Sequence, residues 1–307
     1  MSQPLMSFVI PTFNRSALIE RAIDSILSGE KLDADAFEII VVDDGSTDDT
    51  AMRIQRFTSD ARFKYLAQPQ NKGVAAVRNV GIKRARGRWI VLLDSDNYVV
   101  SGGMALLYKS LLALPEEVGI FWANCVTPNG QKTVLHNHSG IVPGIGVVLG
   151  AYAGEHFSAV RTLLAKTHPF AELGTRNECA ACFWYPISLE TKVYLSQEVL
   201  QYYETHGDDR VTSLKTRLTR APELEICFRE TLSRFGKVLL SRAPEQYWAL
   251  KGKVAFYASI SGNWLGAICS ALLSLRGAHK APVNILIFFI VLAGPRFTRY
   301  ALRKQST

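Results

Sequence analysis

An apolar run that ends in two carboxylates is the feature that most restricts how this chain folds. Residues 89–93 (Trp-Ile-Val-Leu-Leu) are followed directly by Asp94-Ser95-Asp96. Five consecutive apolar residues between a glycine and turn-forming residues predict a strand buried on both faces of a parallel sheet. Ligands of open α/β sheets bind beyond the carboxyl ends of the strands. Asp94 and Asp96 there suit Mg²⁺ or Mn²⁺ carrying a phosphorylated substrate, and an Asx-rich turn is the structural alternative.

Strand and helix patterns alternate along the first 100 residues. The predicted strands cover residues 8–10, 37–42, 63–67 and 89–93, and the predicted helices cover 15–28, about 47–57 and 71–85. This alternation predicts an α/β fold with a mostly parallel sheet flanked by helices and joined by right-handed crossovers. Asp43 and Asp44 follow the second strand. Both acidic pairs are therefore expected at the same edge of one sheet.

Four motifs occur in the order typical of one enzyme family. They are residues 10–15 (Ile-Pro-Thr-Phe-Asn-Arg), 41–50 (Val-Val-Asp-Asp-Gly-Ser-Thr-Asp-Asp-Thr), 71–82, which begin Asn-Lys-Gly, and 93–96 (Leu-Asp-Ser-Asp). Together they resemble the family 2 glycosyltransferases of the GT-A fold over residues 6–100, and more faintly to about 215. The resemblance implies a Rossmann-like domain, a nucleotide-diphosphate sugar donor, a divalent cation held by an Asp-x-Asp (DXD) motif, and inversion at the anomeric carbon.

The same resemblance implies roles for individual residues. Asp96 matches the metal ligand, with Asp94 supporting the metal or the sugar. Asp44 matches the residue that reads the base, and Asp43 is its neighbour. Donor contacts are also implied for Pro11 and Phe13 beside the base, and for Lys72, Arg78 and Asn79 at a helix start near the sugar or phosphate. An exposed helix charge is the structural alternative for Arg78.

The general base for an acceptor hydroxyl is harder to identify. Residues 170–179 are similar to the family segment that brings a catalytic carboxylate as an acidic pair, but here the pair reads Glu178-Cys179. A thiol is a poor substitute for a carboxylate base because its ordinary pKa is near 8.5. We therefore expect Glu178 to be the base. Glu172 is the second choice, and a dipole-favoured position at a helix start is the structural alternative for Glu178.

The segments after residue 100 are expected to serve the acceptor. A helix is predicted over 101–115 and a strand over 118–123, followed by a Gly- and Pro-rich loop or hairpin over 127–148 that covers the active site. His136 and His138 in this loop suit metal or phosphate, although two histidines without a third ligand are more often simply exposed.

Later segments leave two further expectations. Residues 192–211 resemble the family's late acceptor-side loop, in which His206 and Arg210 are candidate contacts of the diphosphate or acceptor, with solvated loop residues as the alternative. Cys179 and Cys182 have the spacing of a redox or zinc half-site, but no second pair and no thioredoxin-like context accompany them, so neither function is expected. The chain opens without a signal-peptide pattern, which predicts reduced thiols in the cytoplasm.

The C-terminal quarter predicts helices that associate with a membrane. Residues 254–275 carry no charge, but their serines and an asparagine make a bilayer span doubtful, and the apolar run 283–293 is too short to cross. Basic residues follow it. We expect two helices lying on an anionic membrane, with a soluble helical hairpin as the alternative. The predicted organisation is a GT-A domain over 1–240 and a helical region over 241–307.

The sequence as a whole predicts a metal-dependent, inverting glycosyltransferase of the hexosyltransferase type. It is expected to move a sugar from a nucleotide-diphosphate sugar to a glycan or lipid-linked acceptor in cell-surface polysaccharide biosynthesis, at the inner face of the cell membrane. The formal charge of +8 fits phosphate or anionic lipid, and no Arg-rich helix with interleaved aromatics favours nucleic acid. A polyprenyl-phosphate sugar synthase, whose phosphate acceptor needs no base, and a non-catalytic nucleotide-sugar-binding protein are the alternatives.

Overall fold

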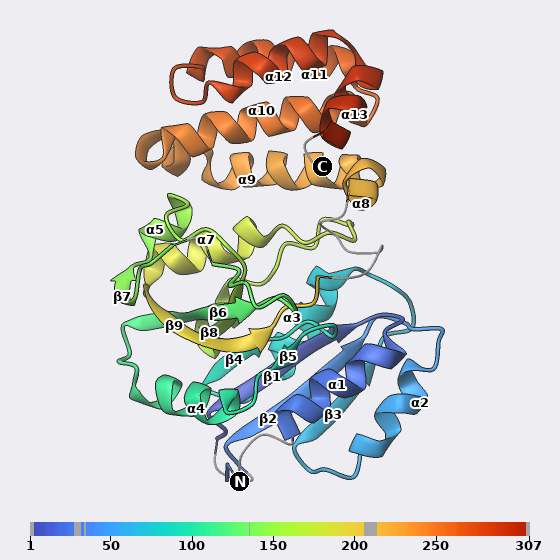
Figure 1. Ribbon diagram of the computed structural model, residues 1–307, viewed down its shortest axis with the longest axis vertical. Helices are drawn as coiled ribbons and strands as arrows, with labels where there is room; N and C mark the ends of the chain where they lie inside the picture. Colours follow the sequence, from blue (N-terminus) through green and yellow to red (C-terminus); the bar gives the residue numbers. More distant parts are fainter. Residues whose placement is uncertain (1–2, 28–31, 34, 135, 206–213, 305–307) are drawn as a thin grey trace. The chain divides into compact units, whose positions relative to one another are not determined.

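A nine-stranded sheet forms the centre of the N-terminal part of the chain in the computed structural model (Figure 1). The structure describes residues 3–27, 32–33, 35–134, 136–205 and 214–304. The strand order is β3-β2-β1-β4-β8-β6-β9-β5, and β7 pairs with β9. The strands are β1 (Met6–Thr12), β2 (Phe37–Asp43), β3 (Phe63–Ala67), β4 (Trp89–Leu92), β5 (Tyr98–Val99), β6 (Val118–Val126), β7 (Gly140–Pro143), β8 (His156–Arg161) and β9 (Lys192–Tyr202).

The first four strands are parallel, as the alternation of strands and helices predicts. β1 lies between β2 and β4, and β3 flanks β2. Residues 39–42 of β2 are completely buried, which is typical of strands covered on both faces. Beyond β4 the sheet is mixed, because β8 runs antiparallel to both β4 and β6 whereas β9 is parallel to β6. The expected α/β class with a helix-flanked sheet is confirmed.

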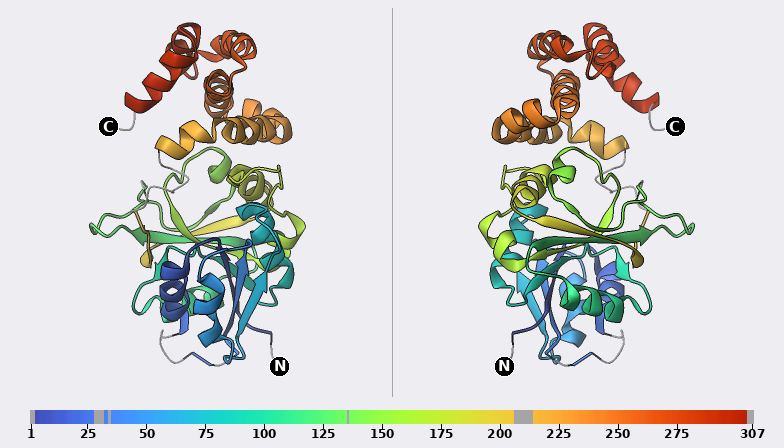
Figure 2. Two further views of the ribbon diagram at one scale, coloured as in Figure 1. Left: turned by 90° about the vertical axis from the view of Figure 1, so that its right-hand side faces the viewer. Right: turned by 90° about the vertical axis from the view of Figure 1, so that its left-hand side faces the viewer.

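Helices cover both faces of this sheet, and each face has its own hydrophobic core (Figure 2). On one face Ile23 and Leu107 pack with Phe8, and on the other Val77 packs with Val9. Alternate residues of β1 thus point to opposite cores, as the period of two in a strand requires. The helices are α1 (Ser16–Leu27), α2 (Thr50–Ile54), η1 (Gln55–Phe57), α3 (Val74–Arg84), α4 (Gly103–Ala113), α5 (Ile145–Val148), α6 (Thr162–Thr167) and α7 (Ala180–Glu190).

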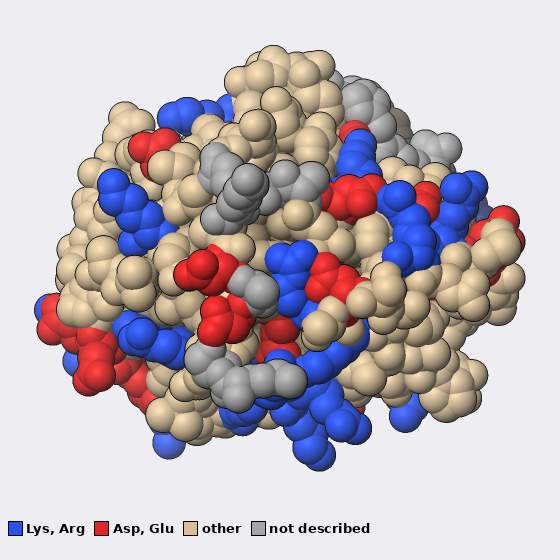
Figure 3. All heavy atoms as spheres, turned by 90° about the horizontal axis from the view of Figure 1, so that it is seen from below, with Lys and Arg blue, Asp and Glu red and all other residues tan. Residues whose placement is uncertain are grey.

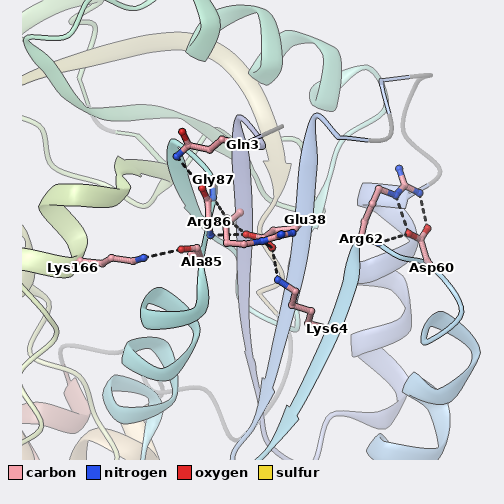
Figure 4. A network of polar contacts seen from close by, with 10 residues as sticks. Gln3, Glu38, Asp60, Arg62, Lys64, Ala85, Arg86, Gly87 and Lys166 are labelled. Carbon is pink, nitrogen blue, oxygen red and sulfur yellow. Dashed lines mark hydrogen bonds and ion pairs between the residues drawn. The ribbon is translucent and has the colours of Figure 1, made fainter. Parts of the chain in front are cut away.

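One buried carboxylate in β2 connects β1, β3 and the segment between α3 and β4 (Figure 4). Glu38 in β2 has a side chain that is only 2% exposed. It accepts hydrogen bonds from Ser7 Oγ at 2.7 Å, Lys64 Nζ at 2.7 Å, and the backbone N and Nε of Arg86 at 2.7 and 3.1 Å. Burial opposes its ionisation, but these donors outweigh burial and hold the pKa of Glu38 below its ordinary value of 4.5. The ionised carboxylate therefore stabilises the fold.

Glu38→Gln is expected to lower the free energy of unfolding by about 3 kcal/mol at pH 7, because it leaves buried donors without their charged partner. The folded pKa lies below the ordinary value, so this stabilisation is complete above about pH 4.5 and is lost as the pH falls through the folded pKa. Urea unfolding at several pH values measures the difference. Asp60→Asn, which removes the half-buried pair with Arg62, is the control and should cost below about 1 kcal/mol. A pH-independent difference for Glu38→Gln would contradict the electrostatic explanation.

Charged side chains elsewhere are mixed in sign. Figure 3 shows Lys and Arg side chains lying beside Asp and Glu side chains over the face viewed from below. Lys83, Arg84, Arg86 and Arg88 are all exposed, but Arg86 is paired with Glu38. This basic run thus contributes in part to an ion-pair network within the fold.

The chain divides into two units, and the second is helical. The first unit contains Met1–Val147, Ala151–Gly174 and Phe183–Thr205, and the second contains Val148–Gly150, Thr175–Cys182 and His206–Thr307. The C-terminal helices are α8 (Leu214–Thr219), α9 (Ala221–Arg242), α10 (Pro244–Ile260), α11 (Trp264–Ser274), η2 (Leu275–Gly277), α12 (Val283–Leu292) and α13 (Pro295–Lys304). The domain boundary expected at residue 240 stays a prediction, and α9 runs through it.

The uncharged stretch 254–275 is two helices rather than one. α10 ends at Ile260, and Gly262, with φ of +97°, turns the chain toward α11. The Asn263 side chain then caps α11 by accepting a hydrogen bond from Gly266 N at 3.1 Å. Among the described residues, every helix falls short of the length and apolar character that a bilayer span requires.

Two sequence-based assignments need correction. The family resemblance predicts a loop over 192–211, whereas residues 192–202 form β9, inside the sheet. Val193 and Leu195 are buried and alternate with more exposed neighbours, a period of two that is typical of a strand. In addition, the region 127–148, predicted as a loop or hairpin, contains β7, which pairs with β9, and α5. β8 has no counterpart among the predicted elements.

Candidate active site

The parallel strands bring the two acidic pairs to one edge of the sheet. Thr12 of β1 is in register with Asp43 of β2, and Val9 of β1 is in register with Leu92 of β4. Asp44 follows β2 directly, and Asp94 comes two residues after β4 ends. Both pairs therefore lie beyond the carboxyl ends of β2 and β4, the two strands that flank β1, and α/β sheets bind their ligands at this edge.

Asp44 is a buried carboxylate that organises the start of α3. Its oxygens accept hydrogen bonds from the backbone N of Lys72 at 2.7 Å and of Gly73 at 2.9 Å. Gly73 has φ of +89°, which a side chain would disfavour, and α3 begins at the next residue. Burial raises the pKa of Asp44 above its ordinary value of 3.8, although both backbone donors favour the ionised form. Lys72 thus contributes its backbone N–H to this arrangement.

Asp43 is also buried, and it connects β2 with β3. Its carboxylate accepts from the backbone N of Ser46 at 2.8 Å and from Tyr65 Oη at 2.6 Å. Burial and this hydrogen bond raise the pKa of Tyr65, which keeps the phenol protonated as a donor. Tyr65 was absent from the predicted site. The only available signal was a polar hydroxyl in a strand that ends beside an acidic pair.

The β1–α1 and β2–α2 loops are fastened to each other beside Phe13. Asn14 adopts φ of +51°, its backbone N donates to Ser46 Oγ at 2.8 Å, and its side chain accepts from Thr47 N at 2.8 Å. Pro11 is buried within β1, whereas Phe13 is 41% exposed. An exposed ring held on a fixed loop is suited to stacking on a flat ligand.

Arg78 and Asp94 form an ion pair between α3 and the end of β4. Arg78 Nη2 lies 2.5 Å from Asp94 Oδ1, and the guanidinium lies over the Phe170 ring at 5.4 Å. The Arg78 side chain is 11% exposed and that of Asp94 is 46% exposed. The structural alternative of an exposed helix charge is therefore wrong for Arg78, because the side chain is largely buried and directed at the predicted site.

Asp96 lies in the turn after β4, and its backbone is fixed by α1. Arg21 Nη2 donates to Asp96 O at 2.8 Å, and the Arg21 guanidinium stacks on the Tyr98 ring at 4.4 Å. Arg21 also pairs with Glu204 at 3.4 Å. Sequence reasoning missed Arg21, although a basic residue among the apolar positions of an amphipathic helix was an available signal.

The carboxylate oxygens at this edge suit a hard divalent cation that takes its other ligands from substrate and water. Asp94 and Asp96 are partly exposed and offer carboxylate oxygens, which Mg²⁺ and Mn²⁺ prefer. In the part of the chain that the structure describes, no three His, Cys, Asp or Glu residues are grouped to enclose a metal. An ion here would therefore depend on substrate phosphate and water for its remaining ligands, as Mg²⁺ commonly does.

The side chains of Asn79 and Glu172 are hydrogen-bonded to each other. Asn79 Nδ2 donates to Glu172 Oε1 at 2.7 Å and to Phe170 O at 3.0 Å, and Phe170 N donates to Asn79 Oδ1 at 2.9 Å. The amide of Asn79 thereby fixes residues 170–172 against α3. Both of its N–H donors are used in this contact, so Asn79 acts on the predicted site through this segment.

Glu178 belongs to the second unit, in the segment that precedes α7. It is half-buried. The neighbouring Arg176 N and Asn177 N donate to Glu223 Oε2 at 2.9 and 3.0 Å, and Arg220 Nη1 donates to Asn177 Oδ1 at 3.0 Å. The first turn of α9 and its N-cap residue therefore fix the backbone directly before Glu178.

The predicted histidine pair gains a third member from β8. His136 Nε2 lies 3.3 Å from His156 Nε2, and His138 N donates to His136 Nδ1 at 3.2 Å. His156 stacks on Trp122, and burial lowers the pKa of His156 to about 4, which leaves it neutral at pH 7. His138 is exposed, as the alternative interpretation expects, whereas His136 is partly buried beside His156. The other predicted contacts, His206 and Arg210, lie outside the described residues.

Comparisons with known proteins agree with this architecture. The model of the family described as glycosyl transferase family 2 matches residues 7–162. The chain is 30% identical over 301 residues to the GalNAc(5)-diNAcBac-PP-undecaprenol beta-1,3-glucosyltransferase of Campylobacter jejuni, with 94% of each chain covered.

Two solved structures share the fold at low sequence identity. Residues 1–349 of Staphylococcus aureus TarS superpose with a TM-score of 0.61 at 17% identity, covering 93% of this chain and 89% of that one. The mannosyltransferase PcManGT of Pyrobaculum calidifontis, solved with GDP-Man and Mn²⁺, gives a TM-score of 0.56 at 18% identity, covering 100% and 88%. These matches confirm the GT-A-like fold. From the family model and the relative that covers 94% of the chain, we conclude that the protein is a glycosyltransferase and belongs to glycosyl transferase family 2.

Proposed function

We propose that this glycosyltransferase transfers a sugar from a nucleotide-diphosphate sugar to a lipid-linked acceptor, with a divalent cation and inversion at the anomeric carbon. The observation that carries the proposal is the pair Asp94 and Asp96 beyond β4, with Arg78 directed at Asp94. A divalent cation held by these two carboxylates would neutralise the charge of a diphosphate leaving group. The acceptor class rests on the Campylobacter jejuni relative, whose name describes an undecaprenyl diphosphate-linked acceptor.

The nucleotide-diphosphate sugar would bind at the sheet edge beyond the carboxyl ends of β2 and β4. Phe13 offers an exposed ring for the base, and the Asp44 carboxylate holds the Lys72–Gly73 backbone where the nucleotide enters. Asp96 and Asp94 would hold Mn²⁺ or Mg²⁺, which when bound neutralises charge that develops on the departing diphosphate. Arg78 adds a fixed positive charge at the same place. Glu178, or Glu172 as second choice, would accept the proton of an acceptor hydroxyl.

The test is release of nucleoside diphosphate from UDP-, GDP- and dTDP-sugars in the presence of Mn²⁺ and a prenyl diphosphate-linked sugar. Acceptor-dependent release that chelation with EDTA abolishes is the expected result. Binding of a nucleotide sugar without any release would instead favour the non-catalytic alternative. Release with a prenyl phosphate alone as acceptor would favour the polyprenyl-phosphate sugar synthase.

The second unit carries features that fit association of the enzyme with an anionic membrane. Large apolar side chains are exposed on α11, α12 and α13, including Leu265, Leu272, Leu273, Leu286, Phe289 and Phe297. Residues 246–307 contain eight basic and no acidic residues, so this segment alone accounts for the formal net charge of +8. Exposed apolar side chains together with an exclusively positive charge are typical of helices that lie on anionic lipid. An acceptor anchored in lipid gives such contact a use.

Replacing two of these apolar side chains should weaken membrane binding. Leu286→Asn with Phe289→Asn, at positions 56% and 61% exposed in α12, is expected to reduce partitioning onto phosphatidylglycerol vesicles about tenfold, because each side chain loses part of its transfer free energy. Sedimentation with vesicles measures the bound fraction. Met52→Asn, 61% exposed in α2, is the matched control and should bind as the wild type does. Equal binding of wild type to phosphatidylglycerol and phosphatidylcholine vesicles would contradict the electrostatic part of the proposal.

A further inference from the structure

Three buried cysteines lie together where α7 begins, within the second unit. Cys179 directly precedes α7, Cys182 lies in its first turn, and Cys227 comes from α9. Cys179 Sγ lies 3.0 Å from Cys182 Sγ, 3.4 Å from Cys227 O and 3.3 Å from Thr231 Oγ1. The exposed fractions of the three cysteines are 4%, 2% and 6%. Cys227 could not be expected beside this pair from local sequence patterns, because it lies 45 positions after Cys182.

The geometry of Cys179 and Cys182 favours bond formation between their sulfurs. A disulfide has an S–S distance of about 2.05 Å, so the two sulfurs need to approach by roughly 1 Å. A Cys-x-x-Cys pair at the start of a helix is also a place where a thiolate is stabilised, because the helix N-terminus is positive. The hydrogen bond with the Cys182 thiol, followed by that with Cys227, lowers the pKa of Cys179 and raises those of its two neighbours. The Cys179 sulfur is thus assigned as the nucleophile, and the Cys182 thiol as its proton-bearing partner.

We propose that Cys179 and Cys182 form a reversible disulfide in response to a small hydroperoxide. The Cys179 thiolate attacks one oxygen of hydrogen peroxide, the O–O bond breaks, and with one proton the products are a sulfenic acid and water. The Cys182 sulfur then displaces the sulfenic oxygen, which leaves as a second water. Overall two thiols lose two electrons and two protons, and the peroxide is reduced to two waters. A small oxidant suits thiols that are nearly inaccessible.

The disulfide would change the segment that carries Glu178. Forming it draws Cys179 toward the first turn of α7, away from its present contacts with Cys227 and Thr231 of α9. Glu178 is the preceding residue, so its backbone follows this movement. This consequence rests on the proposed role of Glu178 as the general base, and it predicts that the oxidised enzyme transfers sugar more slowly. The disulfide itself rests only on the geometry of the cysteines.

The test combines mass spectrometry with activity on the full-length protein. After treatment with hydrogen peroxide and alkylation in denaturant, the expected result is three alkylated thiols rather than five, and a peptide lighter by two hydrogens that links Cys179 to Cys182. Oxidation should lower the transfer rate at least tenfold, and dithiothreitol should restore both the rate and all five thiols. In Cys182→Ser no disulfide should form, so all four remaining thiols should still be alkylated after oxidation. Cys227→Ser should retain the Cys179–Cys182 link. Cys125→Ser, which removes a buried thiol outside the cluster, is the control.

Separate results would overturn the separate parts of this inference. Five alkylated thiols after oxidation, or a link that includes Cys227, would contradict the assigned disulfide. A disulfide that forms without any change in transfer rate would contradict its control of Glu178. If the reduced protein transfers no sugar at all, the proposed function fails, while the masses still decide whether the disulfide forms.

Discussion

Asp96→Ala is expected to reduce the rate of sugar transfer by roughly 10²–10³-fold at saturating donor, which is the size of effect seen when one preorganised electrostatic contact to a transition state is lost. Asp94 alone is not expected to compensate, because its Oδ1 is already paired with Arg78 at 2.5 Å. Asp96 is only partly buried and lies in a turn after β4, so its truncation should leave the hydrophobic core unchanged. The loss should therefore appear in catalysis rather than in folding.

The measurement is initial transfer rate as a function of Mn²⁺ concentration for wild type and variant. If Asp96 supplies a metal ligand, the variant should need a higher Mn²⁺ concentration for half-maximal rate as well as having a lower maximal rate. Asp49→Ala is a suitable control, because Asp49 is exposed at the start of α2 and its side chain makes no capping hydrogen bond. A variant with an unchanged Mn²⁺ dependence would contradict the assignment of Asp96.

The part of the fold that was predictable from sequence is the part built from local patterns. β3 was predicted at residues 63–67, where it is found, and β4 ends one residue before the predicted limit at Leu93. Continuous apolar runs alternating with amphipathic helices fix parallel βαβ units, since the crossovers have one favoured hand. Once those units are assigned, the common edge of Asp43 and Asp94 follows without further information.

The remaining features depend on contacts between distant residues, which a sequence pattern does not encode. β8 is flanked by β4 and β6, and its pairing with β4 joins Leu92 to Ser158 across 66 positions. Three contacts of the predicted site and its surroundings likewise arise only after the chain has folded. They are the ion pair of Arg78 with Asp94, the hydrogen bond from Arg21 to Asp96 O, and the cysteine cluster at Cys179. For β9 the alternating pattern was available, but the family resemblance outweighed it. Short motifs identify a site, whereas the partners of its residues come from tertiary structure.

Glu178→Gln is expected to reduce transfer to an acceptor hydroxyl by roughly 10²–10⁴-fold, the usual contribution of a general base. The amide keeps the size of the side chain and its capacity for hydrogen bonds but cannot accept a proton. Binding of the nucleotide sugar should be unchanged, because the proposed role of Glu178 is to take a proton from the acceptor and the amide has the same size as the carboxylate. The measurement is the maximal transfer rate together with donor affinity from calorimetry.

Glu172→Gln is the matched comparison, since Glu172 is exposed and bonded to Asn79 at 2.7 Å. It should change the rate by less than about tenfold, because a neutral amide oxygen still accepts the Asn79 hydrogen bond. If Glu172→Gln is the inactive variant, the base is Glu172. If both variants are active while Asp96→Ala is not, no carboxylate base is needed, and a phosphate acceptor, already ionised at pH 7, becomes the better assignment. The three variants together thus separate metal binding from proton transfer, and they identify the chemical class of the acceptor before its structure is known.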